Sequence, residues 1–280
     1  MKAHFDPDMI SFLRDRYAVE GYGMQWHVIS HYIIDITLGE NWFDSHCRLG
    51  ENRLAPFAQD TSTDSGAAEF HLTVVRLAHM LFLLRRAPGY DDFTSSLMTR
   101  DFEPVFFELH AASLLFQNSC LVQFVKPTGI KGRDYDLQLS IEENPVAVEV
   151  KSRRAGPITN RKKLKNALLE ARKQLPTDIP GIICVAIASE FRTSPEFAHA
   201  ESEVEVALTE FLRSTKRVNR VLVFWHRFEE EPVRSKTMVK EWKNLNARLQ
   251  LDREWLIADV DELPIQEAVQ NGFPSFMQSA

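Results

Sequence analysis

The sequence predicts an α/β protein with a mixed central sheet flanked by helices, preceded by an α-helical N-terminal region. Between residues 10 and 86, apolar residues recur every three or four positions, which is typical of helices. From residue 120 onward, short β-branched or alternating segments are separated by Gly, Pro and Asn and then alternate with helical segments. We therefore expect a helical region of unknown role over residues 1–95 and an α/β domain over residues 96–280.

The expected elements follow one another along the chain with recognisable boundaries. After the helical region, a helix is expected to begin near Phe102, because Glu103 and Pro104 suit a first turn. Three strands are then expected at 120–126, 134–141 and 145–151. After them, helices at 160–175 and 203–213 are expected to alternate with strands at 181–189 and 220–226.

Composition restricts the class of protein. The 280 residues are 44% hydrophobic and 26% charged, which argues against a disordered chain, a collagen or a disulfide scaffold. A net charge of -6 argues against a wholly basic nucleic-acid coat protein. The 3 cysteines include no CxxC pair, so we expect a cytoplasmic protein. No signal peptide and no stretch that could span a bilayer is visible, and no membrane partner is expected.

Two adjacent predicted strands carry acids on one face. In the strand 145–151, alternation places Glu149 and Lys151 on the face opposite three valines. In the strand 134–141, Tyr135 is expected on the apolar face with Leu137, Leu139 and Ile141, which leaves Asp134 and Asp136 on the other. A hairpin centred between residues 142 and 143 would set Asp136 opposite Glu149, with Cβ atoms about 5 Å apart. A left-handed bulge at Asn144 would shift this register by one residue.

Such a pair of carboxylates predicts a cation site. Two acids at this distance repel each other unless a cation lies between them, and Mg²⁺ or Mn²⁺ accepts one or two carboxylates with water completing the shell. Lys151 could then orient or deprotonate an attacking water, or stabilise charge developing on a phosphate. Asp134 competes with Asp136 for this role because it lies on the same face.

The preceding helix supplies a third acid. Between residues 104 and 116 the polar side chains are only Glu108, His110 and Ser113, so the helix is expected to be buried. A buried carboxylate needs a partner, and Glu108 could join the metal site or accept a hydrogen bond from Lys151.

These residues resemble the PD-(D/E)xK nuclease superfamily, whose restriction-endonuclease-like fold is a mixed sheet flanked by helices. The resemblance covers residues 103–190 and includes the helical acid, the segment VQFVKPTGIKGRDYDLQL, the strand PVAVEVKS and a helix ending ARKQLP. It implies that Asp136 and Glu149 bind the metal, that Lys151 is the catalytic lysine and that Glu108 is the acid from the first core helix.

The resemblance also implies a supporting role for Gln174, which matches a polar residue that some branches carry on the helix after the ExK strand. The proline that often precedes the first acid is replaced by Tyr135. The implied activity is Mg²⁺- or Mn²⁺-dependent hydrolysis of nucleic-acid phosphodiesters, with DNA favoured. The alternatives are a nuclease-like binding module without catalysis and a ribonuclease.

A basic strip begins at the predicted site. Residues 151–165 contain seven cations and no acid, namely Lys151, Arg153, Arg154, Arg161, Lys162, Lys163 and Lys165. Such a strip could neutralise several phosphates and give salt-dependent binding that is largely indifferent to sequence. Nucleic acid is therefore the expected partner, and the helical N-terminal region could recognise substrate, bind another protein or form a homodimer.

Overall fold

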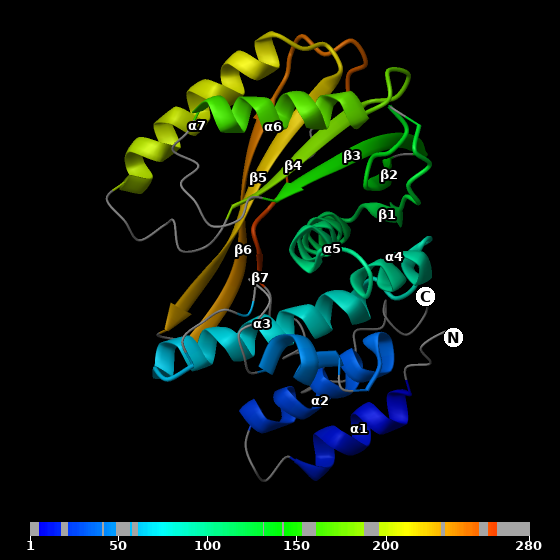
Figure 1. Ribbon diagram of the computed structural model, residues 1–280, viewed down its shortest axis with the longest axis vertical. Coiled ribbons are helices and arrows are strands. Elements are labelled where there is room, and N and C mark those ends of the chain that lie inside the picture. The colour runs from blue at the N-terminus through cyan, green and yellow to red at the C-terminus, as the bar shows by residue number, and fades with distance from the viewer. Residues whose placement is uncertain are drawn as a thin grey trace.

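The computed structural model confirms the predicted fold class, a mixed sheet flanked by helices with a helical N-terminal region (Figure 1). The structure describes residues 6–17, 22–40, 42–48, 57, 61–130, 132–141, 143–152, 161–187, 196–230, 233–251 and 257–261.

Helices and strands follow the expected order along the chain. The helices are α1 Pro7–Arg16, α2 Tyr22–Leu38, the π-helical turn η2 Asp44–Arg48, α3 Asp64–Leu83, α4 Tyr90–Leu97, α5 Phe102–Gln117, α6 Arg161–Gln174 and α7 Glu196–Arg213. The strands are β1 Leu121–Phe124, β2 Leu137–Ile141, β3 Asn144–Ser152, β4 Gly181–Ile187, β5 Val218–Glu230, β6 Val233–Lys243 and β7 Val260–Asp261.

The strands form one 7-stranded sheet in the order β1-β2-β3-β4-β5-β6-β7. The central strands β3, β4 and β5 are parallel, and the other neighbours are antiparallel. Helices α6 and α7 make the crossovers between the parallel strands, as parallel pairing requires. Both crossover helices lie on the same face of the sheet (Figure 1).

Alternation along each strand separates two cores. Val146, Val148 and Val150 of β3 join the core that contains α5, whereas Ala147 joins the core under α6 and α7. The central strands are therefore apolar on both faces, which is the pattern of buried parallel strands. The valines were expected to share one face, and the structure confirms this.

The N-terminal helices share the first of these cores with the sheet. A single cluster of buried side chains runs from Ile10 in α1 through Leu81 in α3 to Phe224 in β5. Polar contacts add to it, because His110 of α5 lies 2.6 Å from the Thr237 hydroxyl of β6. The division of the chain near residue 95 stays a prediction.

Several element predictions need correction. Helix α4 and strands β6 and β7 were not predicted, and α7 begins at Glu196 rather than near residue 203. The sequence of β6, VRSKTMVKEWK, has too few apolar residues for a strand pattern, yet it pairs with β5 along its whole length. Tertiary pairing here overrides the weak local signal.

Within the described part of the chain, no helix combines the length and the apolar character that crossing a bilayer requires.

Candidate active site

Four chemically active side chains predicted from the sequence, those of Glu108, Asp136, Glu149 and Lys151, lie close enough to interact electrostatically. The observed register pairs Leu137 with Val148 and Ile141 with Asn144, which confirms the symmetric register and not the one-residue slip. The turn residue Glu143 takes the left-handed conformation, with φ at 67°. This register places Asp136, which immediately precedes β2, beside Glu149 of β3.

Asp136 is held by the backbone of β3. Its amide donates to the Val148 carbonyl at 3.1 Å, and its carboxylate Oδ2 accepts from the Val150 amide at 2.7 Å. The strand itself begins one residue later, at Leu137, and not at residue 134 as expected. The carboxyl of Asp136 is therefore positioned by main-chain bonds and not by a flexible loop.

Glu149 and Lys151 form an ion pair on the same strand. The distance from Lys151 Nζ to Glu149 Oε1 is 2.6 Å, and the Glu149 side chain is only 3% exposed. The second oxygen, Glu149 Oε2, is buried and has no hydrogen-bond partner among the residues that the structure describes. A buried carboxylate oxygen without a donor is unfavourable unless a proton or a cation satisfies it.

The pKa values of Asp136 and Glu149 are both raised, as expected for buried carboxyl groups close to one another. Burial raises the pKa of Asp136 well above its ordinary value, and the charges of Glu149 and Glu108 raise it further. Burial also raises the pKa of Glu149 to about 7, although Lys151 acts in the opposite direction. Asp136 and Glu149 are therefore close enough for each to influence the pKa of the other.

Glu108 lies in the same cluster but has a different partner from the one expected. Its carboxylate accepts two hydrogen bonds from the Arg100 guanidinium, at 2.7 and 3.1 Å, instead of a bond from Lys151. Burial raises the pKa of Glu108, and Arg100 followed by Lys151 lowers it. Lys151 is thus a neighbour and not the direct partner.

Arg100 is a site residue that the sequence reading missed. It lies between α4 and α5, and the positive charge is near enough to Asp136 for the two to interact electrostatically. Arg100 lies outside the helix that carries Glu108, so no helical spacing rule connects the two residues. The only signal was the need of a buried Glu108 for a cationic partner.

Asp134 does not join the cluster. Its Oδ1 accepts from the Thr128 amide at 2.6 Å, from the Thr128 hydroxyl at 2.7 Å and from the Gly129 amide at 3.0 Å. These bonds lower the pKa of Asp134 and close the loop before β2. Its expected competition with Asp136 is not supported, because its carboxylate is already committed to this loop.

Tyr135 and Gln174 also differ from expectation. Tyr135 packs against the core under α6 and α7, and its hydroxyl donates to Gln138 Oε1 at 2.9 Å, so it does not share the face of Leu137. Gln174 is the half-buried last residue of α6, and in the described structure no hydrogen bond connects it to the acids.

Some cations of the basic strip are paired with an acid of the neighbouring helix. Arg161 pairs with Glu210 of α7, and Lys165 lies 3.7 Å from the same carboxylate. The sequence segment holds no acid, but the neighbouring helix supplies one. Lys162 and Lys163 are exposed on the first turn of α6, whereas Arg153 and Arg154 lie outside the described residues.

A metal would have two carboxylates at this site. The unsatisfied, buried Glu149 Oε2 and the adjoining Asp136 carboxyl are hard oxygen donors of the kind that Mg²⁺ and Mn²⁺ accept. Among the described residues, no group of three or more His, Cys, Asp or Glu side chains is arranged to hold a metal ion. Water or a phosphate oxygen would have to complete the coordination shell, as is usual for Mg²⁺.

Comparison with known proteins does not identify a family, because no protein-family model and no curated protein matches this chain.

Proposed function

We propose that this chain is a divalent-metal-dependent nuclease, with DNA as the favoured substrate. One observation carries the proposal: Asp136, Glu149 and Lys151 lie together, and Glu149 Oε2 is buried without a donor. The resemblance to the PD-(D/E)xK superfamily supports it, because these are the three residues that match the metal-binding acids and the lysine.

Asp136 and Glu149 are the residues that would hold Mg²⁺ or Mn²⁺. When bound, such an ion supplies stabilisation of negative charge on the phosphate and a lower pKa for an adjacent water. The main-chain bond from Val150 keeps the Asp136 carboxyl facing this position. Because the pKa of both acids is raised, binding of a cation would compete with protonation of these carboxyl groups.

Lys151 has the position of a group that acts on substrate. Its side chain is 31% exposed while that of Glu149 is 3% exposed, so the amine lies between the buried acid and solvent. From there it would donate a hydrogen bond to a phosphate oxygen or hold the attacking water in line. Arg100, with a side chain 43% exposed, would keep Glu108 in place and contribute positive charge near Asp136.

The exposed cations at the start of α6 are the proposed contacts to the phosphate backbone. Lys162 and Lys163 belong to the helix that follows β3, so they lie after the strand that carries Glu149 and Lys151. We also propose a cytoplasmic location, since the chain has only 3 cysteines and no CxxC pair. A homodimer stays a prediction.

A cleavage assay tests the proposal. The purified chain should cut DNA in the presence of Mg²⁺ or Mn²⁺ and not in EDTA, and Lys151→Ala should reduce cutting by at least about a hundredfold. Lys126→Ala is the matched control, because Lys126 is exposed and pairs with Asp92 away from the acids. Circular dichroism would verify that both variants fold. Equal cutting by the wild type and Lys151→Ala would refute the assignment, and parallel digestion of RNA decides between the two nucleic acids.

A binding module without catalysis is the second candidate, because the Lys151–Glu149 ion pair already satisfies one oxygen of the acid. Calorimetric titration with Mn²⁺ separates the two. A nuclease requires an ion that binds the wild type and not Glu149→Gln, whereas a binding module without the metal shows no such difference.

A further inference from the structure

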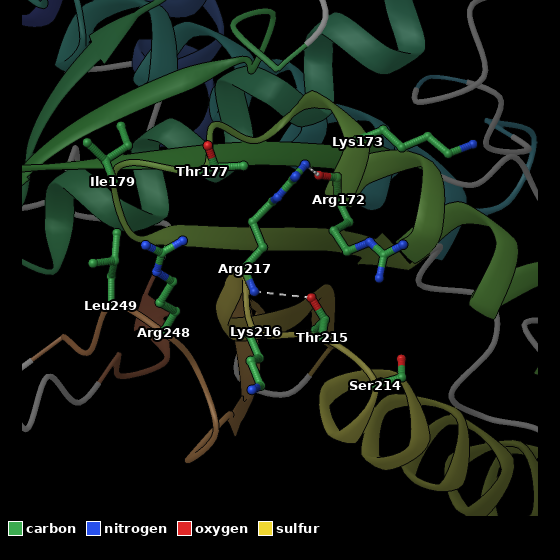
Figure 2. A pocket seen from close by; sticks show the side chains of 10 residues that line it. All are labelled: Arg172, Lys173, Thr177, Ile179, Ser214, Thr215, Lys216, Arg217, Arg248 and Leu249. Atoms are coloured by element: carbon green, nitrogen blue, oxygen red, sulfur yellow. Dashed lines mark hydrogen bonds between the residues drawn. The ribbon is translucent and has the colours of Figure 1, made fainter.

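A basic cavity lies at the end of the sheet where the central strands β4 and β5 begin. Its volume is about 450 Å³, and its walls come from the end of α6, the end of α7 and the segment after β6 (Figure 2). Among the described residues, its lining contains no carboxylate and five cationic side chains, which are Arg172, Lys173, Lys216, Arg217 and Arg248. A concave surface with several cations and no acid favours an anionic ligand.

The cavity is separate from the acids. Arg217 and Ile179 precede the first residues of β5 and β4, whereas Glu149 pairs in register with Ile183, farther along β4. Four residues of extended chain from Ile179 to Ile183 correspond to roughly 13 Å. The cavity therefore does not belong to the site already described, and an inference from it does not rest on the proposed nuclease activity.

Two of the five cations are already engaged. Arg217 donates to the carbonyls of Arg172 and Leu175, at 3.1 and 3.4 Å, and so caps the end of α6. Lys173 pairs with Glu170 at 2.6 Å and points away from the other cations in Figure 2. These two have a structural reason to be here, because helix C-termini favour positive charge.

The other three cations have no such reason. The side chains of Arg172, Lys216 and Arg248 form no hydrogen bond and no ion pair with any part of the chain that the structure describes. The Arg248 amide donates to the Lys216 carbonyl at 2.8 Å, so the segments that carry these two cations are joined by their main chains. Three unpaired cations held around one hollow repel one another unless an anion binds between them.

We propose that this cavity binds a phosphate group, carried either by a nucleotide or by the end of a nucleic-acid strand. Two guanidinium groups can each contact phosphate oxygens with paired N–H donors, and Lys216 adds a third positive charge. Ile179 and Leu249 provide apolar contact at one side of the cavity, next to Arg248 (Figure 2). The volume lies within the range of sites for small ligands, so a sugar or a base can enter with its phosphate.

Binding measurements in EDTA test the proposal without any contribution from catalysis. Calorimetric titration with pyrophosphate should show binding to the wild type that Lys216→Ala/Arg248→Ala weakens at least about tenfold. The matched control is Arg86→Ala/Lys126→Ala, which removes the same charge from exposed positions outside this cavity and should retain wild-type affinity.

Two further probes identify the source of the phosphate. Tighter binding of AMP than of adenosine indicates a nucleotide, and tighter binding of a 5′-phosphorylated DNA strand than of its 5′-hydroxyl form indicates a strand end. The proposal is overturned if the wild type does not bind pyrophosphate, if the two double variants lose affinity equally, or if neither phosphate-bearing probe is preferred. Thermal unfolding of both double variants would show that lost binding does not reflect lost folding.

Discussion

Glu149 is a buried acid whose proton affinity links site chemistry to stability. Its pKa rises from an ordinary 4.5 to about 7, so the folded protein holds this proton more tightly than the unfolded chain does. The stability from this group is therefore present below about pH 4.5 and is lost as pH rises to about 7, a change of roughly 3 kcal/mol.

We predict that Glu149→Gln reduces this pH dependence, because the amide does not ionise, whereas Asp136, whose pKa is also raised, retains its own contribution. Urea unfolding of both proteins in EDTA, from pH 4.5 to pH 8, measures the effect. In EDTA, the variant should gain stability relative to the wild type as pH rises. In a separate measurement at pH 8, with Mg²⁺ in place of EDTA, the ion should stabilise the wild type alone. Parallel pH profiles for the two proteins would contradict the prediction.

Arg100 is the residue on which the buried charge of Glu108 depends. We predict that Arg100→Ala lowers the free energy of unfolding by about 2 kcal/mol at pH 7, because a carboxylate with an 8% exposed side chain loses both of its hydrogen bonds. The loss should be smaller at pH 5, where Glu108 is more readily protonated. Urea unfolding measures it, with the exposed Arg133→Ala as a control. Equal stability of the two variants at pH 7 would show that Glu108 does not need Arg100.

At the scale of elements, the packing of α7 against α6 sets how much positive charge α6 can offer. Glu210 pairs with both Arg161 and Lys165 and so neutralises part of the basic strip. We predict that Glu210→Gln increases the affinity of the protein for DNA several-fold at low salt, because it releases these cations for phosphate contacts. Fluorescence anisotropy in EDTA, at low and at raised salt, measures the change.

Glu203→Gln is a suitable control for this measurement, since it removes a charge elsewhere on α7. A gain in affinity by both variants alike would indicate a general charge effect. No gain by Glu210→Gln would show that the strip does not contact the nucleic acid.

In the whole molecule, one core joins the N-terminal helices to the sheet. Leu81 of α3 is fully buried in the same cluster as Val148 of β3. We predict that Leu81→Ala destabilises the chain by about 2–5 kcal/mol and that Val148 loses amide protection together with α3. Hydrogen exchange measures this, with the 71% exposed Leu121→Ala as a control. Loss of protection in α3 alone would mean that the two regions unfold separately.

Local patterns in the sequence determined the fold class and much of the candidate site. Strict alternation in 145–151 and a symmetric turn at 142–143 indicated the register that the structure has, because both are properties of neighbouring residues, but they left open a slip of one residue. The need of a buried Glu108 for a partner was also readable. The identity of that partner was not, since Arg100 lies outside the helix and reaches the acid only in the folded chain.

Only the tertiary structure decided the charge balance of the surface. Glu210 reaches the basic strip from a helix that begins more than thirty residues later. The cations of the basic cavity come from three separate segments. The loop that holds Asp134 likewise shows that an acid on the expected face can be committed elsewhere. Periodicity predicts which way a side chain points along its own element, but electrostatic partners depend on which elements the fold places next to each other.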